Sequence, residues 1–304
     1  MDAARSRLWI VGAGGMLGGD LVEEARAAGL SCVTSDREVD ITDAARVRAF
    51  AEQHRPAWII NAAAYTAVDQ AEREPALAMA INGDGPGHLG AAAAAIGAVV
   101  VHFSTDYVFD GHGDRPWVEA DPTGPLSSYG RSKLAGERRL AEATDRFFIF
   151  RISWLYGVRG KNFVKTVVRL LREKPELRIV ADQIGSPTWT RPLARQVIGL
   201  AGRMADDRGS DGPYGIYHYS DDGYLSWYEF ALGIREEALA AGLIEHAPPI
   251  VPIATSDYPL PAPRPANSRF CRDKVQRDLG FTIFPWRRNL AEYFAEWRSA
   301  GFCT

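Results

Sequence analysis

The chain has 304 residues, of which 46% are hydrophobic and 24% are charged, and its formal net charge is −3 at pH 7. These values are ordinary for a soluble globular protein of one large or two small domains. The small net charge gives no indication of a nucleic-acid or anionic-membrane partner, and no apolar run approaches the roughly 18 residues of a membrane span. The short polar start lacks the apolar core of a secretory signal, so we expect a cytoplasmic protein.

The cysteines and histidines do not indicate a metal site. The three cysteines, Cys32, Cys271 and Cys303, lack metal-ligand spacing, and their odd number is typical of free thiols in a reducing compartment. A contact between Cys271 and Cys303 stays open. The six histidines show no H-x-x-x-H arrangement, which argues against a catalytic zinc ion.

The first predicted strand, Leu8 to Val11, leads into a glycine-rich loop and then a helix that continues to about Ala28. A strand, a glycine loop and a helix in this order form the opening of a dinucleotide-binding fold. The glycines let the backbone turn tightly and approach a pyrophosphate, and the start of the helix offers free N–H groups. These predicted cofactor-binding glycines are Gly12, Gly15 and Gly18.

The second predicted strand, Ser31 to Ser35, ends at Asp36 and Arg37. An acid about 20 residues beyond the glycines normally binds the ribose hydroxyls of NAD, whereas an adjacent arginine can accept the 2′-phosphate of NADP. Both residues are present, so the sequence leaves the choice between NADPH and NADH open. Asp40 and Ile41 follow, and we predict that they lie beside the adenine.

Three more strands are predicted, and helices separate all of them. The strands are residues 58–61, 98–103 and 147–152, and the main helices are residues 47–54, 87–96 and 127–143. This alternation predicts an α/β fold with a Rossmann-type doubly wound parallel sheet. Small residues follow the strand that ends at Asn61, and they allow a ligand to approach the carboxyl end of that strand closely.

The helix that starts near Ser127 carries Tyr129 and Lys133. Because they are four residues apart, both side chains lie on one face of that helix. A neighbouring ammonium group lowers the pKa of a phenol, whose ordinary value is about 10. We therefore predict that Tyr129 is a proton donor and that Lys133 lowers its pKa. Thr105, at the end of another strand, offers a hydroxyl to the substrate carbonyl, and Asp106 can orient the substrate.

The last third of the chain is less periodic. Helices are predicted at residues 161–174, 191–204, 226–241, 271–279 and 286–298, a strand at 216–219 and an exposed loop at 206–213. The proline-rich stretch 250–265 cannot form a regular helix, and we expect it to lie extended over the substrate cleft. We predict a dinucleotide-binding domain over residues 1–153, with 190–220 returning to it, and a smaller α/β substrate domain made of 154–189 and 221–304.

Longer strings of residues are more specific than any single motif. They are the glycine loop, Asn61–Asp69, Ser104–Gly111, Tyr129–Glu137, Arg151–Gly157, Asn162–Val164, Asp182–Thr188 and Pro263–Ser268. Together they resemble the extended short-chain dehydrogenase/reductase superfamily and, within it, the dTDP-4-dehydrorhamnose reductase family. The resemblance spans nearly the whole chain.

The resemblance implies reduction of the C4 keto group of dTDP-4-dehydro-L-rhamnose to dTDP-L-rhamnose, with NADP(H) or NAD(H) as cofactor. It implies that Tyr129 donates the proton and that Lys133 holds the nicotinamide ribose. The residues expected along the cofactor are Gly15, Met16 and Leu17 at the pyrophosphate, Asp36, Arg37, Asp40 and Ile41 at the adenosine, and Ala63, Ala64, Tyr65 and Phe103 towards the nicotinamide. The residues expected to contact the nucleotide sugar are Thr105, Asp106 and Trp154.

Two other interpretations stay open. The chain could be a 4-ketoreductase for a different dTDP-deoxysugar of secondary metabolism, because few residues decide the orientation of one hydroxyl. It could also be a non-catalytic regulatory subunit that binds a dinucleotide, as some relatives of the family are. Some family members hold magnesium at a dimer contact, but the acids concerned do not map onto this sequence, so we predict no metal. We expect a monomer or a homodimer.

Overall fold

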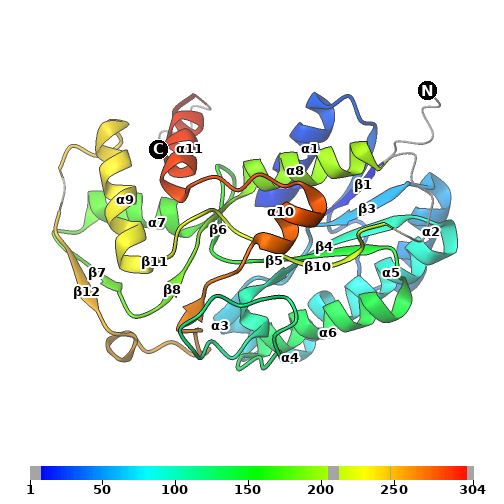
Figure 1. Cartoon of the computed structure of the whole chain (residues 1–304), viewed down its shortest axis with the longest axis horizontal. Helices are drawn as coiled ribbons and strands as arrows, with labels where there is room; N and C mark the ends of the chain where they lie inside the picture. The colour runs from blue at the N-terminus through cyan, green and yellow to red at the C-terminus, as the bar shows by residue number, and fades with distance from the viewer. Residues whose placement is uncertain (1–7, 205–211, 247, 300–304) are drawn as a thin grey trace.

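The computed structural model describes residues 8–204, 212–246 and 248–299. Its centre is a six-stranded sheet of order β10-β5-β4-β3-β1-β2, in which all neighbours pair in parallel (Figure 1). The strands are β1 (Leu8–Val11), β2 (Cys32–Ser35), β3 (Trp58–Asn61), β4 (Val99–Thr105), β5 (Phe147–Ile152) and β10 (Gly215–Tyr219). This order is that of a doubly wound sheet, so the fold class predicted from the sequence is confirmed.

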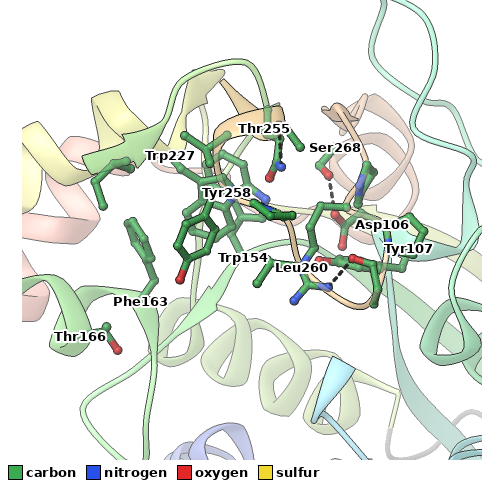
Figure 2. Close-up of a pocket in the computed structure, with 18 of the residues that line it drawn as sticks. Asp106, Tyr107, Trp154, Phe163, Thr166, Trp227, Thr255, Tyr258, Leu260 and Ser268 are labelled. Atoms are coloured by element: carbon green, nitrogen blue, oxygen red, sulfur yellow. Dashed lines mark hydrogen bonds between the residues drawn. The ribbon is translucent and has the colours of Figure 1, made fainter. Parts of the chain in front are cut away.

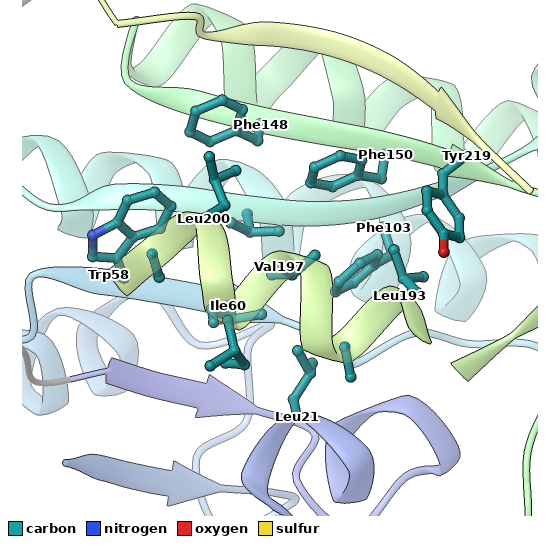
Figure 3. Packing of buried hydrophobic residues seen from close by; sticks show 14 of the residues in the cluster. Leu21, Trp58, Ile60, Phe103, Phe148, Phe150, Leu193, Val197, Leu200 and Tyr219 are labelled. Atoms are coloured by element: carbon teal, nitrogen blue, oxygen red, sulfur yellow. The ribbon is translucent and has the colours of Figure 1, made fainter. Parts of the chain in front are cut away.

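Helices cover both faces of this sheet (Figure 1). On one face lie α1 (Met16–Ala27) and α8 (Thr190–Arg203); on the other lie α2 (Ala44–His54), α3 (Val68–Ala71), α4 (Pro75–Met79), a π-helical turn (Ala80–Asp84), α5 (Gly85–Ile96) and α6 (Ser128–Ala143). Figure 3 shows Leu193, Val197 and Leu200 of α8 packed over Phe148 and Phe150 of the sheet. Alternate residues of β4 point to opposite faces, so His102 and Ser104 face α6.

A second group of helices packs beside the sheet around its own hydrophobic cluster (Figure 1). It consists of α7 (Phe163–Glu173), α9 (Trp227–Ala240) and α11 (Trp286–Ser299), with β7 (Leu177–Val180) paired in parallel to β12 (Ile250–Ile253). Since α8 and β10 join the sheet in space, the chain crosses between the two parts several times. The domain boundaries proposed from the sequence stay a prediction. No helix among the described residues is long and apolar enough to cross a membrane.

Several elements differ from the sequence prediction in their ends. The α2 helix begins three residues earlier than expected, because the Asp43 carboxylate accepts the backbone N–H groups of Ala45 and Arg46. The strand predicted to end at Phe103 continues through Thr105. The predicted cap of α9 is present: Ser226 and Glu229 form a capping box.

Five short strands were not predicted. The strands β6 (Leu155–Tyr156), β8 (Ile184–Gly185), β9 (Thr188–Trp189), β11 (Leu225–Ser226) and β13 (Asn267–Ser268) have two residues each, too few for a periodic pattern.

The α10 helix (Asp273–Leu279) was predicted, but it starts two residues later than expected. Most of the predicted loop 206–213 and Cys303 lie outside the described residues, and Cys32 and Cys271 are free thiols.

A glycine lets α6 approach the π-helical turn. A Cβ atom at Gly136 would lie 2.1 Å from the backbone carbonyl oxygen of Asn82, so only glycine fits this crossing. The Asn82 side chain donates to the Ser132 hydroxyl on α6 and to the backbone carbonyl of Tyr65, and it accepts the Tyr65 N–H. The close crossing therefore connects α6 to the loop after β3.

We predict that Gly136→Ala lowers the free energy of unfolding by about 1–3 kcal/mol, because backbone must move to admit the methyl group. Gly202→Ala on α8 is the matched control: no atom lies within 4 Å of its Cβ position, and alanine favours the helix by up to about 1 kcal/mol. Urea denaturation measures the free energy of unfolding of both variants. Equal stability of the two variants would contradict the packing described.

Candidate functional site

The loop between β1 and α1 exposes its backbone at the carboxyl edge of the sheet. Gly12 has φ +75°, and a Cβ atom there would lie 2.7 Å from the backbone nitrogen of Ala63. A Cβ atom at Gly18 would lie 2.0 Å from the carbonyl oxygen of Gly12. Gly12 and Gly18 thus shape the loop, whereas Gly15 is exposed and is the N-cap of α1. This loop fits an anion such as a pyrophosphate at the start of α1.

The two residues after Gly15 differ in accessibility. Met16 is partly buried, and its sulfur lies 3.6 Å from the amide nitrogen of Asn162. Leu17 is buried in the hydrophobic cluster beneath α8, so its side chain belongs to the core. Met16 therefore stays partly accessible to a ligand, whereas Leu17 can face a ligand only with its backbone.

Asp36 lies at the glycine loop, where its Oδ2 atom accepts the Gly14 N–H at 3.1 Å. Gly14 and Asp36 line a cavity of about 440 Å³, and Arg26 and Arg159 also belong to its lining. Arg37 is exposed at the next position. This is the place where the sequence predicts the adenosine of the cofactor.

Asp40 and Ile41 have different surroundings. Asp40 accepts the backbone N–H and the hydroxyl of Thr42, and these hydrogen bonds lower the pKa of its carboxyl group. Ile41 is buried against Gly85, where a Cβ atom would lie 2.7 Å from the Ile41 Cδ1 atom. The Ile41 side chain therefore packs in the core, and only Asp40 is exposed at the surface.

The loop after β3 lies across from the glycine loop. Asn61 accepts the Ala63 N–H at 3.1 Å, and Ala64 is partly buried. The Tyr65 hydroxyl donates to Glu74 at 2.6 Å, and this hydrogen bond raises the pKa of Tyr65 to about 12. Phe103 belongs to the core, where its ring stacks on another phenylalanine of the sheet.

One face of α6 carries Tyr129, Lys133 and Glu137 in successive turns; Lys133 and Glu137 are buried, and Tyr129 is partly buried. Ser127 caps the helix by accepting the Gly130 N–H at 3.0 Å. Lys133 is 2% exposed, and its Nζ atom donates to the carbonyl oxygen of Phe103 at 2.5 Å. This hydrogen bond ties the α6 helix to β4 at the position where a catalytic lysine is predicted.

Burial dominates the acid–base properties of this face. It lowers the pKa of Lys133 to about 8, against the opposing effect of Glu137. Burial also raises the pKa of Tyr129, the charge of Asp106 raises it further, and a hydrogen bond with Thr105 opposes both. The pKa of Tyr129 therefore lies above 10, and the lowering that the sequence predicted is wrong for this state. The Lys133 amine is held by the β4 backbone.

Thr105 and Asp106 meet the C-terminal part of the chain at the end of β4. The Thr105 hydroxyl donates to Asp106 at 2.9 Å, and the Ser268 hydroxyl donates to the other carboxylate oxygen at 2.5 Å. Asp106 is 3% exposed, and burial raises the pKa of its carboxyl group to about 6 despite these hydrogen bonds. The carboxylate thus lies beside Tyr129 at a cost in folding free energy.

A cavity of about 600 Å³ opens beside Asp106, between the two parts of the chain. Figure 2 shows Phe163 and Trp227 at one end of this cavity and Asp106, Tyr107 and Ser268 at the other. Trp154 also lines it, with φ +49° and its ring stacked on Trp227 at 3.6 Å. Among the described residues, the lining includes Asp106 and Trp154 but not Thr105, Tyr129 or Lys133.

The Tyr107 ring connects the cavity to the predicted catalytic tyrosine. It lines the cavity and packs edge-on against the Tyr129 ring, with ring centroids 5.5 Å apart. Sequence reasoning missed Tyr107 as well as Trp227, Arg178 and Tyr258 in the lining. Tyr107 stands within one of the recognised strings, whereas the other three carry no signal of their own.

The proline-rich segment forms one wall of the cavity, as the sequence predicts. Its Arg264 side chain makes an ion pair with Asp69 at 2.7 Å, and the Ala262 N–H donates to the same carboxylate. These contacts hold the segment against α3, which follows the loop after β3. Within the described ranges, no group of three or more His, Cys, Asp or Glu side chains could hold a metal ion.

The raised pKa of Asp106 predicts a stability that falls as pH rises. Below about pH 4 the carboxyl group is protonated in both the folded and the unfolded chain, so it adds no cost. Between about pH 4 and pH 6 the unfolded chain ionises first, and above that range the cost is about 3 kcal/mol. When the pH is raised from 4 to 7.5, we expect the free energy of unfolding of Asp106→Asn to increase by this amount relative to that of the wild type.

Denaturant unfolding at both pH values measures this difference. Asp114→Asn removes a carboxylate from an exposed loop position and should change the free energy of unfolding by less than about 0.5 kcal/mol. If the difference between wild type and Asp106→Asn is the same at both pH values, Asp106 is not held in the environment described.

The chain is similar to known proteins over nearly its whole length. A family model described as the RmlD substrate binding domain matches residues 6–299. The dTDP-4-dehydrorhamnose reductase of Burkholderia thailandensis is 40% identical over 92% of this chain and 95% of its own length. That of Aggregatibacter actinomycetemcomitans is 42% identical over 94% of this chain and 97% of its own length.

A solved structure agrees as well. The crystal structure of dTDP-4-dehydrorhamnose reductase from Bacillus anthracis in complex with NADP has a TM-score of 0.87 and 38% identity, and the match covers 96% of this chain and 99% of that chain. These similarities extend over nearly the whole chain and confirm the resemblance seen in the sequence motifs. The chain therefore belongs to the dTDP-4-dehydrorhamnose reductase family.

Proposed function

We propose that the protein reduces the C4 keto group of dTDP-4-dehydro-L-rhamnose to dTDP-L-rhamnose, with NADPH as the preferred cofactor and NADH as a possible substitute. One observation carries the proposal: Tyr129 lies on the face of α6 that packs against the end of β4, and its ring packs edge-on against Tyr107, which lines the cavity. The chain's membership of the dTDP-4-dehydrorhamnose reductase family supports the assignment of this substrate.

We place the cofactor at the carboxyl edge of the sheet. The proposed contacts are Gly15, Met16 and the Leu17 backbone at the pyrophosphate, Asp36, Arg37 and Asp40 at the adenosine, and Ala63, Ala64 and Tyr65 towards the nicotinamide. A glycine-rich loop with exposed backbone at the start of a helix is suited to binding a pyrophosphate. When bound, the reduced nicotinamide supplies the hydride for C4.

The residues at the end of β4 and on α6 then act on the substrate oxygen. A raised pKa keeps the proton on Tyr129 at neutral pH, so the hydroxyl is ready to protonate the developing alkoxide. The Thr105 hydroxyl, which donates to Asp106 in the structure, would rotate to donate its hydrogen bond to the same oxygen. Lys133, in its ammonium form, stabilises the tyrosinate left by the transfer. These interactions strengthen as negative charge develops, which is where they accelerate the reaction.

The cavity is proposed to hold the nucleotide sugar, with Asp106 and Trp154 as its contacts near the reacting carbon. Arg178 and Arg264 in the same lining can neutralise the diphosphate of a dTDP-sugar. We place the reaction in the cytoplasm, where free thiols such as Cys32 and Cys271 stay reduced.

We predict that the wild type consumes NADPH when freshly generated dTDP-4-dehydrorhamnose is added, measured at the nicotinamide absorbance band. Tyr129→Phe should be at least about a hundredfold slower because it removes the proton donor, yet it should still bind NADPH. Tyr224→Phe is the control: its hydroxyl donates to the Phe270 carbonyl outside the cavity lining, so turnover should be unchanged.

No turnover with NADPH or NADH, by protein that still binds cofactor, would rule out the rhamnose assignment. A panel of other 4-keto-deoxysugar nucleotides would then test the alternative substrate. Failure of the whole panel would favour the non-catalytic regulatory subunit.

We also predict that Arg37→Ala raises the KM for NADPH about tenfold and changes the KM for NADH by less than about twofold. The reason is that an exposed arginine after Asp36 is positioned for the 2′-phosphate, which NADH lacks. Steady-state kinetics with both cofactors measure this ratio. An equal rise for the two cofactors would show that Arg37 does not select between them.

A further inference from the structure

A buried polar row lies directly behind Lys133. His102 on β4 is the register partner of Asn61 on β3, and both face α6. Asn61 and His102 are each 1% exposed. The His102 ring lies between Asn61 and Lys133: its Nδ1 atom is 3.0 Å from the Asn61 Nδ2 atom, and its Nε2 atom is 3.4 Å from the Lys133 amine. The function proposed above does not use this histidine.

The hydrogen bonds of Asn61 decide which ring nitrogen of His102 carries the proton. The Asn61 Oδ1 atom accepts the Ala63 N–H at 3.1 Å, so the Nδ2 atom is the one that faces the His102 ring. An amide NH₂ group can only donate. The Nδ1 atom of His102 must therefore accept, which leaves the single proton of a neutral ring on Nε2.

The ring is neutral because it is completely enclosed. Burial, reinforced by the charge of Lys133, lowers the pKa of His102 well below 6.5. Its Nε2–H group therefore points at the Lys133 amine. An ammonium group has three donors and no acceptor, whereas a neutral amine has a lone pair that can accept this N–H. The contact thus favours the uncharged form of Lys133.

We propose that His102 is a positioning residue for the reductase reaction: Asn61 fixes its Nε2–H tautomer, and this donor makes the Lys133 ammonium release its proton readily. The proposal rests on the proposed function of Lys133, and it deepens that function. Lys133 keeps one hydrogen bond in both forms, because the Phe103 carbonyl accepts from the ammonium and from the amine alike.

The other charged groups around Lys133 act differently. Glu137, one turn further along α6, favours the ammonium form, but its carboxylate is paired with Arg151 on β5 at 2.7 Å. Tyr129 lies one turn earlier on α6, and Asp106 at the end of β4 acts on Tyr129. Among these neighbours, His102 is the one that presents a donor to the amine.

This arrangement returns a proton to Tyr129 after each turnover. The tyrosinate takes a proton from the Lys133 ammonium, so that an N–H bond breaks and the O–H bond of Tyr129 forms. The neutral amine left behind accepts a hydrogen bond from the Nε2–H of His102, and a solvent proton (H⁺), the one that the overall reduction consumes, then restores the ammonium. No oxidant or reductant takes part in this step.

The tautomer can be observed without any activity assay, by long-range ¹H–¹⁵N NMR correlation of protein labelled with ¹⁵N-histidine. Between pH 6 and pH 8 we expect His102 to be neutral with its proton on Nε2. His218 is an internal reference of the opposite kind, because its Nδ1 atom lies 3.0 Å from the Trp117 carbonyl and must donate. A His102 with its proton on Nδ1, or with two protons, overturns the proposal even if the reductase activity is confirmed.

The pH profile of kcat/KM tests the consequence. Asn61→Asp keeps the acceptor for the Ala63 N–H but accepts the Nδ1 proton of His102, which turns Nε2 into an acceptor for the ammonium. We expect the basic limb, set by Lys133, to move up by about one pH unit. His102→Leu removes the donor and should move the limb in the same direction, whereas His218→Gln should leave it in place.

A downward shift in His102→Leu would mean that the wild-type ring accepts a hydrogen bond from the ammonium, and the proposal would be wrong. The NMR spectra keep the two proposals separable. A protein without reductase activity but with the Nε2–H tautomer contradicts the proposed function and leaves only the tautomer assignment of His102 standing. The other tautomer in an active enzyme contradicts only the role of His102.

Discussion

The buried ion pair of Glu137 and Arg151 fixes α6 against the central sheet, and the position of Tyr129 and Lys133 follows from it. Both partners are 3% exposed, and Ser104 of β4 donates to the same carboxylate. Removal of one partner from such a pair leaves an uncompensated buried charge, which typically costs about 3–5 kcal/mol. Because Glu137 is two helical turns from Tyr129 on the same face, this anchor sets both the depth and the rotation of the helix at the site.

The site holds its ionisable groups away from water, and this explains their chemistry. Burial raises the pKa of Asp106 to about 6 and lowers that of Lys133 to about 8, while the pKa of Tyr129 moves upwards. A tyrosine of this kind is a proton donor at neutral pH rather than a base. The same burial costs folding free energy, which packing interactions in the hydrophobic clusters of the described residues must offset.

The sequence predicts the sheet, the glycine loop and the Tyr129–Lys133 face well, because each depends on local periodicity or spacing. The direction of the Tyr129 pKa could not be predicted, since burial depends on packing between distant segments. The stack of Trp154 on Trp227 and the ion pair of Asp69 with Arg264 join residues far apart in the chain. His102 was missed because it stands in a strand that is otherwise apolar, where its contacts with Asn61 are not visible from spacing.

The most direct test of the central claim is NMR of the sugar product after turnover with NADPH deuterated at the transferred position. The proposed reaction places one deuterium on C4 of dTDP-L-rhamnose, because hydride reaches C4 and the proton from Tyr129 goes to the oxygen. Deuterium at C4 of the opposite epimer would assign the protein to another deoxysugar. Deuterium absent from the sugar, in protein that binds both ligands, would contradict the reductase function itself.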